Sequence, residues 1–425
     1  MAKHFKKITL ANGLRLLLVP RKESLAASVV ILVAAGSEYE KKPVNGVSHF
    51  LEHMTFKGTS RRPRVGQIAE ELAGLGAQSN AFTGQEYTGY WAKAEARKLP
   101  KILDIVSDLY LNPLFQAAEI EKERGVIVEE INMYNDMPKA KVQEDLAALM
   151  YGDQPAGWSI AGEKEIVKKL AREDFLAYRN ARYVPEGTLV IIAGKFDEKT
   201  VLRKVRQEFG GLERGKAPKK VRTREAQASP AVFVRHKESE QSHIAFGFRA
   251  FPLFDRRRYA LQVLADVLGG GMSSRLFKRV RDELGAAYYI GADADLFLDH
   301  GVFGVAAGVD HGKTDIVARA ILEECAKLRD TLVPHEELMR SKEHMIGGLI
   351  LGLETSDELA SFYGGQEILT GKINTPEFVM DSVKAVTPAA VRSVARAVFR
   401  NDRMNFSAIG PYRDGGTFKK IITLP

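Results

Sequence analysis

Cysteine is almost absent from this 425-residue chain, and long apolar runs are missing altogether. The single cysteine, Cys325, excludes an internal disulfide and suits a reducing compartment, and we expect it to be a small buried side chain. No apolar run reaches the roughly eighteen residues that a transmembrane helix needs. The N-terminal segment MAKHFKKITL also lacks the apolar core of a secretory signal. These absences predict a cytoplasmic protein with no membrane partner.

The composition is ordinary, so the distribution of charge is more informative. Apolar residues make up 45% and charged residues 27% of the chain, as in a soluble protein of about two to four domain-sized units. Much of the net charge of +8 lies in residues 214–224, RGKAPKKVRTR. This segment contains a proline and no aromatic side chain. We interpret it as an exposed basic linker rather than a nucleic-acid site, and predict no nucleic-acid partner.

The most informative segment present is HFLEH at residues 49–53. On a helix, residues three or four apart share a face, so His49 and His53 can bind one metal ion with Glu52 beside it. The pattern H-x-x-E-H is the inverted form of the H-E-x-x-H zinc-protease helix. The alternative is a solvated polar stripe. A third ligand at a suitable place would favour the metal.

An acidic segment further along the chain offers that ligand. Residues 119–136, EIEKERGVIVEEINMYND, have the apolar spacing of a helix. Glu123 and Glu130 are seven positions apart and share a face, whereas Glu129 points about a third of a turn away. A helix that presents Glu130 to a metal would let Glu123 accept the free ring N–H of a ligating histidine. The alternative is an ordinary acidic surface helix.

The chain also contains an internal repeat. The tetrapeptides RKES and HKES begin 215 positions apart (236 − 21), and each opens a predicted strand that a helix follows. Near the end of each half, YVPEGTLVIIAG and FRNDRMNFSAIG close on glycines 216 positions apart (410 − 194). The predicted repeat elements are strands 28–35 and 243–248, the helix of His49 and its counterpart over 256–268, and helices 172–179 and 388–398. The two halves are therefore expected to be copies of one unit.

The repeat predicts a metal site in only one half. The second-copy positions equivalent to the metal-binding residues fall near Leu264, Val267 and Leu268, which cannot ligate zinc. The predicted domains are a zinc-binding domain over 1–212, a basic linker over 213–230, and a homologous domain without metal ligands over 231–425. The predicted fold class is α+β.

Hairpin signals favour a largely antiparallel sheet in each half. Residues 8–20 form a predicted hairpin around Asn12-Gly13, the strongest short-range hairpin signal. Residues 79–92 form a second hairpin that turns at Thr83-Gly84-Gln85. The first strand of this hairpin is predicted over residues 78–82.

Together these segments resemble the pitrilysin/insulinase family of zinc metallopeptidases, which includes the mitochondrial processing peptidases and many bacterial homologues. His53 and Glu130 are separated by 76 residues (130 − 53 − 1). The resemblance covers nearly the whole chain and is carried by HFLEHMTFKGT at 49–59, GAQSNAFTGQEYTGYWA at 76–92 and LADVLGGGMSSRLFKRVRDELGAAY at 264–288. It implies one Zn²⁺ per chain held by His49, His53 and Glu130, with Glu52 as general base and Glu123 as the supporting carboxylate.

The resemblance has further implications for substrate and assembly. The strand over 78–82 would be an edge that pairs with a substrate backbone, with Asn80, Ala81 and Phe82 as substrate-binding residues. Arg281 and Tyr288 would be catalytic residues that reach the zinc site of a facing half-molecule. The two tandem domains would form half of a clamshell, and the chain would be a homodimer.

The predicted function is that of a zinc-dependent endopeptidase that hydrolyses peptides or unfolded polypeptide segments through a metal-bound water. Two alternatives remain at this point. The chain could be one subunit of a heterodimeric processing peptidase, or it could be a non-catalytic structural homologue.

Overall fold

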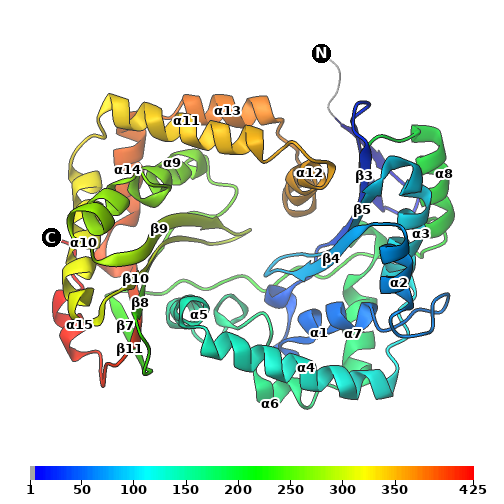
Figure 1. Ribbon diagram of the computed structural model, residues 1–425, viewed down its shortest axis with the longest axis horizontal. Helices are drawn as coiled ribbons and strands as arrows, with labels where there is room; N and C mark the ends of the chain where they lie inside the picture. Colours follow the sequence, from blue (N-terminus) through cyan, green and yellow to red (C-terminus); the bar gives the residue numbers. More distant parts are fainter. Residues whose placement is uncertain (1–4) are drawn as a thin grey trace. The chain divides into compact units, whose positions relative to one another are not determined.

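The computed structural model describes residues 5–425, which divide into two compact units (Figure 1). Unit 1 consists of residues 5–131, 159–221 and 350–375, and unit 2 of residues 132–158, 222–349 and 376–425. Residues 1–4 of the segment MAKHFKKITL lie outside the described residues. Among residues 5–425, no helix combines the length and apolar character needed to span a bilayer. Each unit consists of one β-sheet with helices on its faces.

The sheet of unit 1 has six strands in the order β1-β2-β6-β3-β5-β4. In chain order these strands are β1 (Lys6–Thr9), β2 (Arg15–Pro20), β3 (Ala26–Val33), β4 (Gln78–Thr83), β5 (Thr88–Glu95) and β6 (Thr188–Gly194). Both predicted hairpins are present: β1 pairs with β2, and β4 with β5. All pairs are antiparallel except β2–β6. The sheet is therefore mixed, and β4 lies at its edge.

Helices cover both faces of this sheet, which explains why β3 is almost wholly buried. Successive side chains of a strand point to opposite faces. Val29, Ile31 and Val33 of β3 pack in the larger apolar cluster of unit 1, while Val30 and Leu32 pack on the other face against α12 (Ser356–Thr370). The other helices that lie wholly in unit 1 are α1 (Val47–Thr55), α2 (Gln67–Gly74), α3 (Leu99–Leu111), α6 (Lys164–Val167), α7 (Arg172–Arg182) and α8 (Glu198–Phe209).

The sheet of unit 2 has five strands in the order β7-β11-β8-β10-β9. They are β7 (Ala231–His236), β8 (Ser242–Arg249), β9 (Ala287–Leu296), β10 (Gly301–Val309) and β11 (Met404–Gly410). The helices of unit 2 are α5 (Pro138–Tyr151), α9 (Arg258–Gly269), α10 (Thr314–Asp330), α11 (His335–Leu351), α13 (Pro376–Lys384), α14 (Pro388–Val398) and α15 (Gly416–Ile421). The long helix α4 (Ala117–Asp136) begins in unit 1, and the last residues of α11 also cross the division between units.

The internal repeat is visible strand by strand. Three strands of unit 1 have counterparts of the same length in unit 2: β2 corresponds to β7, β3 to β8 and β6 to β11. Each counterpart begins 216 residues later in the chain (231 − 15, 242 − 26 and 404 − 188). The strand orders β2-β6-β3-β5-β4 and β7-β11-β8-β10-β9 correspond position for position. The predicted duplication of one α+β unit is therefore confirmed.

One helix of each half is exchanged between the units. α12 comes from the second half of the sequence but packs on β3 and β6 of unit 1. α5 comes from the first half but packs on β8 and β11 of unit 2. This division by compactness differs from the sequential boundaries expected above, because each sheet needs a helix on its second face and takes it from the other half of the chain.

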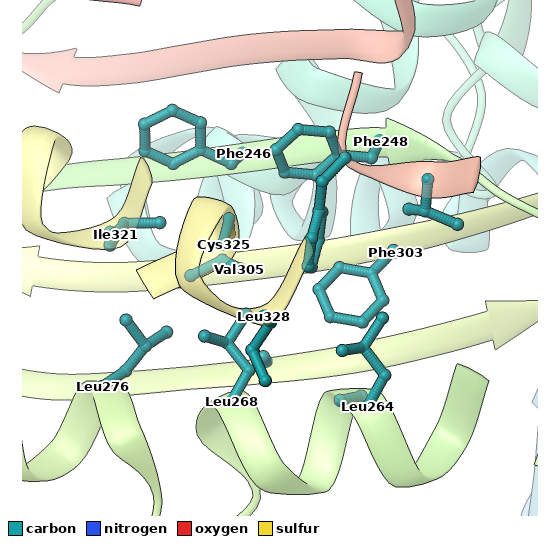
Figure 2. Packing of buried hydrophobic residues seen from close by; sticks show 14 of the residues in the cluster. Phe246, Phe248, Leu264, Leu268, Leu276, Phe303, Val305, Ile321, Cys325 and Leu328 are labelled. Carbon is teal, nitrogen blue, oxygen red and sulfur yellow. The ribbon is translucent and has the colours of Figure 1, made fainter. Parts of the chain in front are cut away.

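The positions in unit 2 that the 215-residue offset of the sequence repeat predicts as equivalents of the metal-site helix lie in an apolar core. Leu264, Val267 and Leu268 of α9 are at most 2% exposed. Leu264 and Leu268 belong to the same cluster as Phe303 and Cys325 (Figure 2). Cys325 is itself fully buried, as expected, and burial raises the pKa of its thiol. At these positions the second copy has buried apolar side chains in place of polar ones.

The exchanged helix α12 leads to a prediction about stability. Tyr363 of α12 is 1% exposed and lies in the cluster that covers the second face of the unit 1 sheet. Tyr363→Ala should lower the free energy of unfolding of unit 1 by about 3–5 kcal/mol, because it leaves a cavity of aromatic size. Trp91 packs against the same cluster, so its fluorescence in a Trp158→Phe background reports this unit in denaturant titrations.

Phe254 provides the control, because its side chain is 58% exposed. Phe254→Ala should change the same transition by less than about 0.5 kcal/mol. If Tyr363→Ala left the Trp91 transition where the control leaves it, α12 would not be part of the folded core of unit 1.

Candidate metal and catalytic site

The helix α1 separates an apolar face from a polar face. Phe50, Leu51 and Met54 are no more than 1% exposed and pack in the core of unit 1. The side chains of His49 and His53 keep 13% and 22% of their surface exposed. The three apolar side chains thus anchor the helix in the core, and the imidazoles lie on its other side.

The helix α4 brings Glu130 to these imidazoles. Glu130 Oε2 lies 3.7 Å from His49 Nε2 and 3.4 Å from His53 Nε2. One ligand atom from each of the three residues lies within 4.8 Å of the others. Glu129 is exposed and does not belong to this group. The two-turn periodicity that favoured Glu130 over Glu129 therefore agrees with the geometry.

Glu123 lies one layer behind the group of three. Its Oε1 is 2.9 Å from His53 Nδ1, and its Oε2 pairs with Lys57 Nζ at 2.5 Å. Burial would raise the pKa of Glu123, but the bonds to His53 and Lys57 lower it overall. The carboxylate is thus held as an acceptor, which fixes His53 with its proton on Nδ1 and leaves Nε2 free to bind a metal. Lys57 was not anticipated from the sequence.

The electrostatics of the site differ between the two imidazoles. Burial lowers the pKa of His49 to about 4, so this ring is neutral. Burial also acts to lower the pKa of His53, but the Glu123 hydrogen bond and the nearby carboxylates raise it overall. His49 Nδ1 is buried and has no hydrogen-bond partner among the described residues. Only His53 has its ring orientation fixed by a carboxylate.

These residues fit a zinc ion on the chemistry of their donors. Two imidazole nitrogens and one carboxylate are the ligand types of a catalytic zinc site, which keeps a further position open for water or substrate. The three donor atoms converge, and the supporting carboxylate orients one ring in the manner usual for metal-bound histidines.

Glu52 lies beside the ligands, where it can exchange a proton. Burial raises the pKa of its carboxyl, partly offset by the hydrogen bond that Thr83 donates to Oε2 at 2.5 Å. A raised pKa brings a carboxylate closer to the range of an effective general base. Thr83 was expected only as a turn residue. Its role could not be seen in the sequence, because the contact depends on how β4 packs beside α1.

The predicted substrate-binding residues lie on the free edge strand. Ala81 of β4 is 9% exposed and packs in the cluster that contains the apolar face of α1. Phe82 points to the opposite face and is 37% exposed, with its ring against Tyr87 at a centroid distance of 5.6 Å. Asn80 is exposed, and its Oδ1 accepts the backbone N–H of Ala81 at 2.9 Å.

Arg281 and Tyr288 lie in unit 2. Arg281 lies in the π-helix η6 (Phe277–Glu283), Gly285 follows this helix with a φ of 52°, and Tyr288 lies in β9. Arg281 Nη1 donates to the carbonyl oxygen of Tyr288 at 3.2 Å, and its guanidinium lies over the Phe277 ring. The Tyr288 side chain is strongly exposed, at 76%. Both residues are thus accessible and linked to each other.

The basic linker departs from its expected exposure most clearly at Lys220. The segment over 213–230 has no helix or strand. The Lys220 side chain, however, is only 7% exposed and pairs with Glu38 and Glu86, which are also buried. Glu86 follows β4 in the turn before β5. The linker is therefore bound to the sheet of unit 1 next to the edge strand, so the expectation of a uniformly exposed linker was wrong.

Comparison with known proteins identifies the family. Residues 16–164 match the model described as insulinase, peptidase family M16, and residues 169–345 match the one described as peptidase M16 inactive domain. The chain is 33% identical to an uncharacterized zinc protease of Bacillus subtilis, over 93% of this chain and 96% of that protein. This chain belongs to the M16 family.

Other M16 relatives agree in sequence and in fold. An uncharacterized zinc protease of Mycobacterium leprae is 34% identical, over 98% of this chain and 94% of its own length. The crystal structure of a Helicobacter pylori protease superimposes with a TM-score of 0.91 at 22% identity, covering 96% and 99% of the two chains. A Pseudomonas fluorescens structure described as a peptidase M16 inactive domain gives 0.88 at 18% identity, with the same coverage. The predicted family and the predicted two-domain α+β fold are confirmed.

The donor geometry predicts the metal content of this M16 chain and of its ligand variants. The purified protein should bind about one zinc per chain. His49→Ala and His53→Ala should each lose that zinc and all peptidase activity, because two remaining ligands hold zinc poorly. Elemental analysis after dialysis against a metal-buffered solution measures this. Stoichiometric zinc in either variant would exclude the site as drawn.

A matched pair of glutamates provides the control. Glu130→Gln should lose the metal, whereas Glu129→Gln, one residue away on the exposed side of α4, should keep it. The opposite pattern would assign the third ligand to Glu129.

Proposed function

We propose that the protein is a zinc-dependent endopeptidase that cleaves peptides or unfolded polypeptide segments. The observation that carries the proposal is the convergence of His49, His53 and Glu130 beside a half-buried carboxylate, Glu52, whose pKa is raised by partial burial. M16 membership and relatives named zinc proteases support the reaction class. A complete set of ligands argues against the non-catalytic alternative.

The proposed chemistry assigns one role to the metal and the rest to side chains. Bound zinc would supply a water of lowered pKa and polarise the peptide carbonyl. Glu52 accepts the proton of the attacking water and later returns it to the leaving amine. Thr83 donates to Oε2 of Glu52, so we assign the proton transfer to Oε1. Glu123 holds His53 in one tautomer throughout.

The proposed substrate lies along β4. A free edge strand offers backbone N–H and C=O groups to an extended peptide, which binds as an added strand with little demand on its sequence. β4 is one of the two edge strands of the unit 1 sheet, and its last residue, Thr83, contacts Glu52. A peptide on β4 would therefore pass the general base. In this arrangement Asn80, Ala81 and Phe82 are substrate-binding residues.

We also propose that the active protein is a homodimer in which each site is shared. The three proposed zinc ligands all belong to the first half of the sequence, whereas Arg281 and Tyr288 belong to the second half. Two copies related by a two-fold axis would each supply the residues that the other lacks. Arg281 would bind a substrate carbonyl or carboxylate, and the exposed Tyr288 hydroxyl would donate to the oxyanion. A heterodimer with a related chain is the alternative assembly.

Glu52→Gln separates metal binding from chemistry. Glutamine keeps the size of the side chain but cannot accept a proton at neutral pH. The variant should retain zinc and peptide binding while kcat falls by about 10²–10⁴-fold, as expected for a lost general base. Turnover of a diverse peptide library, with zinc content measured on the same sample, tests this. Near-normal turnover in the zinc-loaded variant would reject the role of Glu52.

Mixing two inactive variants tests the shared site. Tyr288→Phe removes only a hydroxyl, so it should spare zinc and lower the rate by about tenfold to a thousandfold. In a mixture with Glu52→Gln, a mixed dimer with shared sites has one intact site and one doubly damaged site. Activity should therefore rise above that of both parents. Absence of recovery, with subunit exchange confirmed by mass, would show that each chain uses its own tyrosine and would leave the zinc mechanism intact.

A further inference from the structure

The N-terminus of α1 lacks an ordinary cap. Gly46 precedes the helix in a left-handed conformation, with φ of 93°, and has no side chain that could accept the first free N–H groups. A Cβ at this position would come within 2.6 Å of the Ala161 carbonyl oxygen, so a capping residue cannot replace the glycine. Val47 and Ser48 are fully buried, so water cannot serve as the acceptor.

Glu40 provides the acceptor from outside the helix. It directly follows the single turn η1 (Ser37–Tyr39) and is only 3% exposed. Its Oε2 accepts the backbone N–H of Gly46 at 2.7 Å and the Asn45 side-chain amide at 2.9 Å. Its Oε1 accepts the backbone N–H of Ser48 at 2.8 Å and also the Ser48 hydroxyl. Both carboxylate oxygens are therefore engaged on the first turn of α1.

The charge of this carboxylate suits the position. Burial raises the pKa of Glu40 to about 7, while the bonds from Ser48, Gly46 and Asn45 limit the rise. Negative charge at a helix N-terminus also interacts favourably with the helix dipole. The donors and the dipole together offset part of the cost of desolvating this carboxylate, which without partners would be strongly destabilising.

The residue that follows Ser48 is His49. His53 is oriented through Glu123, but His49 Nδ1 has no hydrogen-bond partner among the described residues. The direction of the His49 ring is therefore set by the packing and the backbone of the first turn of α1, the turn that Glu40 holds. A shift of that turn would move His49 Nε2 relative to Glu130 Oε2, which lies 3.7 Å away.

We infer that Glu40 is a positioning residue of the metal site, which aims His49 at the metal by fixing the first turn of α1. This inference rests on the proposed function, since it assumes that His49 binds zinc. Glu40 touches neither the proposed metal ligands nor the substrate strand. It acts through the backbone and hydroxyl of Ser48.

The test compares Glu40→Gln with a matched control. Glutamine puts an NH₂ group where an acceptor is needed, so one bond to the first turn becomes a donor–donor contact. The control is Glu367→Gln, which also alters a fully buried carboxylate of unit 1, one that pairs with Arg15 on the opposite face of the sheet. Both variants should lose thermodynamic stability. Only Glu40→Gln should weaken zinc binding, by about 10–100-fold.

Two measurements report on the site itself. The zinc dissociation constant comes from competition with a chromogenic chelator on the full chain. The visible absorption of the Co²⁺-substituted protein reports the ligand geometry, which should change in Glu40→Gln and match the wild type in Glu367→Gln. Equal zinc affinity and equal Co²⁺ spectra in Glu40→Gln and the wild type would overturn the inference.

A second variant keeps the test decisive if Glu40→Gln does not fold. Ser48→Ala removes the hydroxyl bond to Glu40, together with the hydroxyl's contact to Tyr178, and keeps the backbone bond to Glu40. It should weaken zinc binding severalfold, and unchanged affinity would contradict the inference. If the wild-type chain itself binds no zinc, the proposed function fails. If it binds zinc and cleaves peptides while these variants bind zinc normally, only the role of Glu40 fails.

Discussion

The attachment of α1 to the core of unit 1 is the constraint on which the site depends. A helix of nine residues is too short to be stable alone in water, so its position must come from tertiary contacts. Phe50, Leu51 and Met54 fix one face in the core. Polar contacts then fix the remaining freedom at each end, from Glu40 to the first turn and from Glu123 to His53. Together these contacts hold both ends and one face of the helix that carries the two imidazoles.

The duplicated fold shows what happens to the same framework without a metal. α9 occupies the place of α1 beside the edge strand of its own sheet and packs against β9 and α14. At the positions that the sequence repeat predicts as equivalents of the metal site, α9 has leucines and a valine. Leu264 and Leu268 are part of the apolar core of unit 2 (Figure 2). The description of the second matched region as an inactive domain agrees with this replacement. The exchanged helices α5 and α12 make each compact unit depend on both halves of the sequence.

Much of the site could be predicted because it is local or periodic. The spacing of His49, Glu52 and His53 is a property of one helix, and the seven-residue interval selects Glu130 over Glu129. The hairpins and the repeat can also be predicted, because turn residues such as Asn12-Gly13 and similar segments at a constant offset can be recognised in the sequence itself. The parallel pairs β2–β6 and β7–β11 were not expected, because nothing local encodes which distant strand completes a sheet.

The contacts that could not be predicted join segments far apart in the chain or across a turn. Thr83 reaches Glu52 only because β4 packs beside α1, and Lys220 is buried only because Glu38 and Glu86 converge at one turn. A basic residue in a basic linker is normally solvated, so its sequence context indicated exposure. The exchange of α5 and α12 likewise depends on tertiary packing, because each helix packs on the sheet formed mainly by the other half of the sequence.

The edge strand β4 must satisfy two opposing requirements. In the proposed binding mode a free edge accepts an extended peptide, but such an edge also risks pairing with any other exposed strand. β4 has only six residues and presents Gln78, Ser79 and Asn80 as exposed polar side chains. Asn80 Oδ1 accepts the Ala81 N–H, a group that an added strand would use. In the proposed binding mode, an incoming peptide would displace this contact. The Asn80 side chain thus covers the Ala81 N–H, and rotation of this one side-chain amide would expose the N–H again.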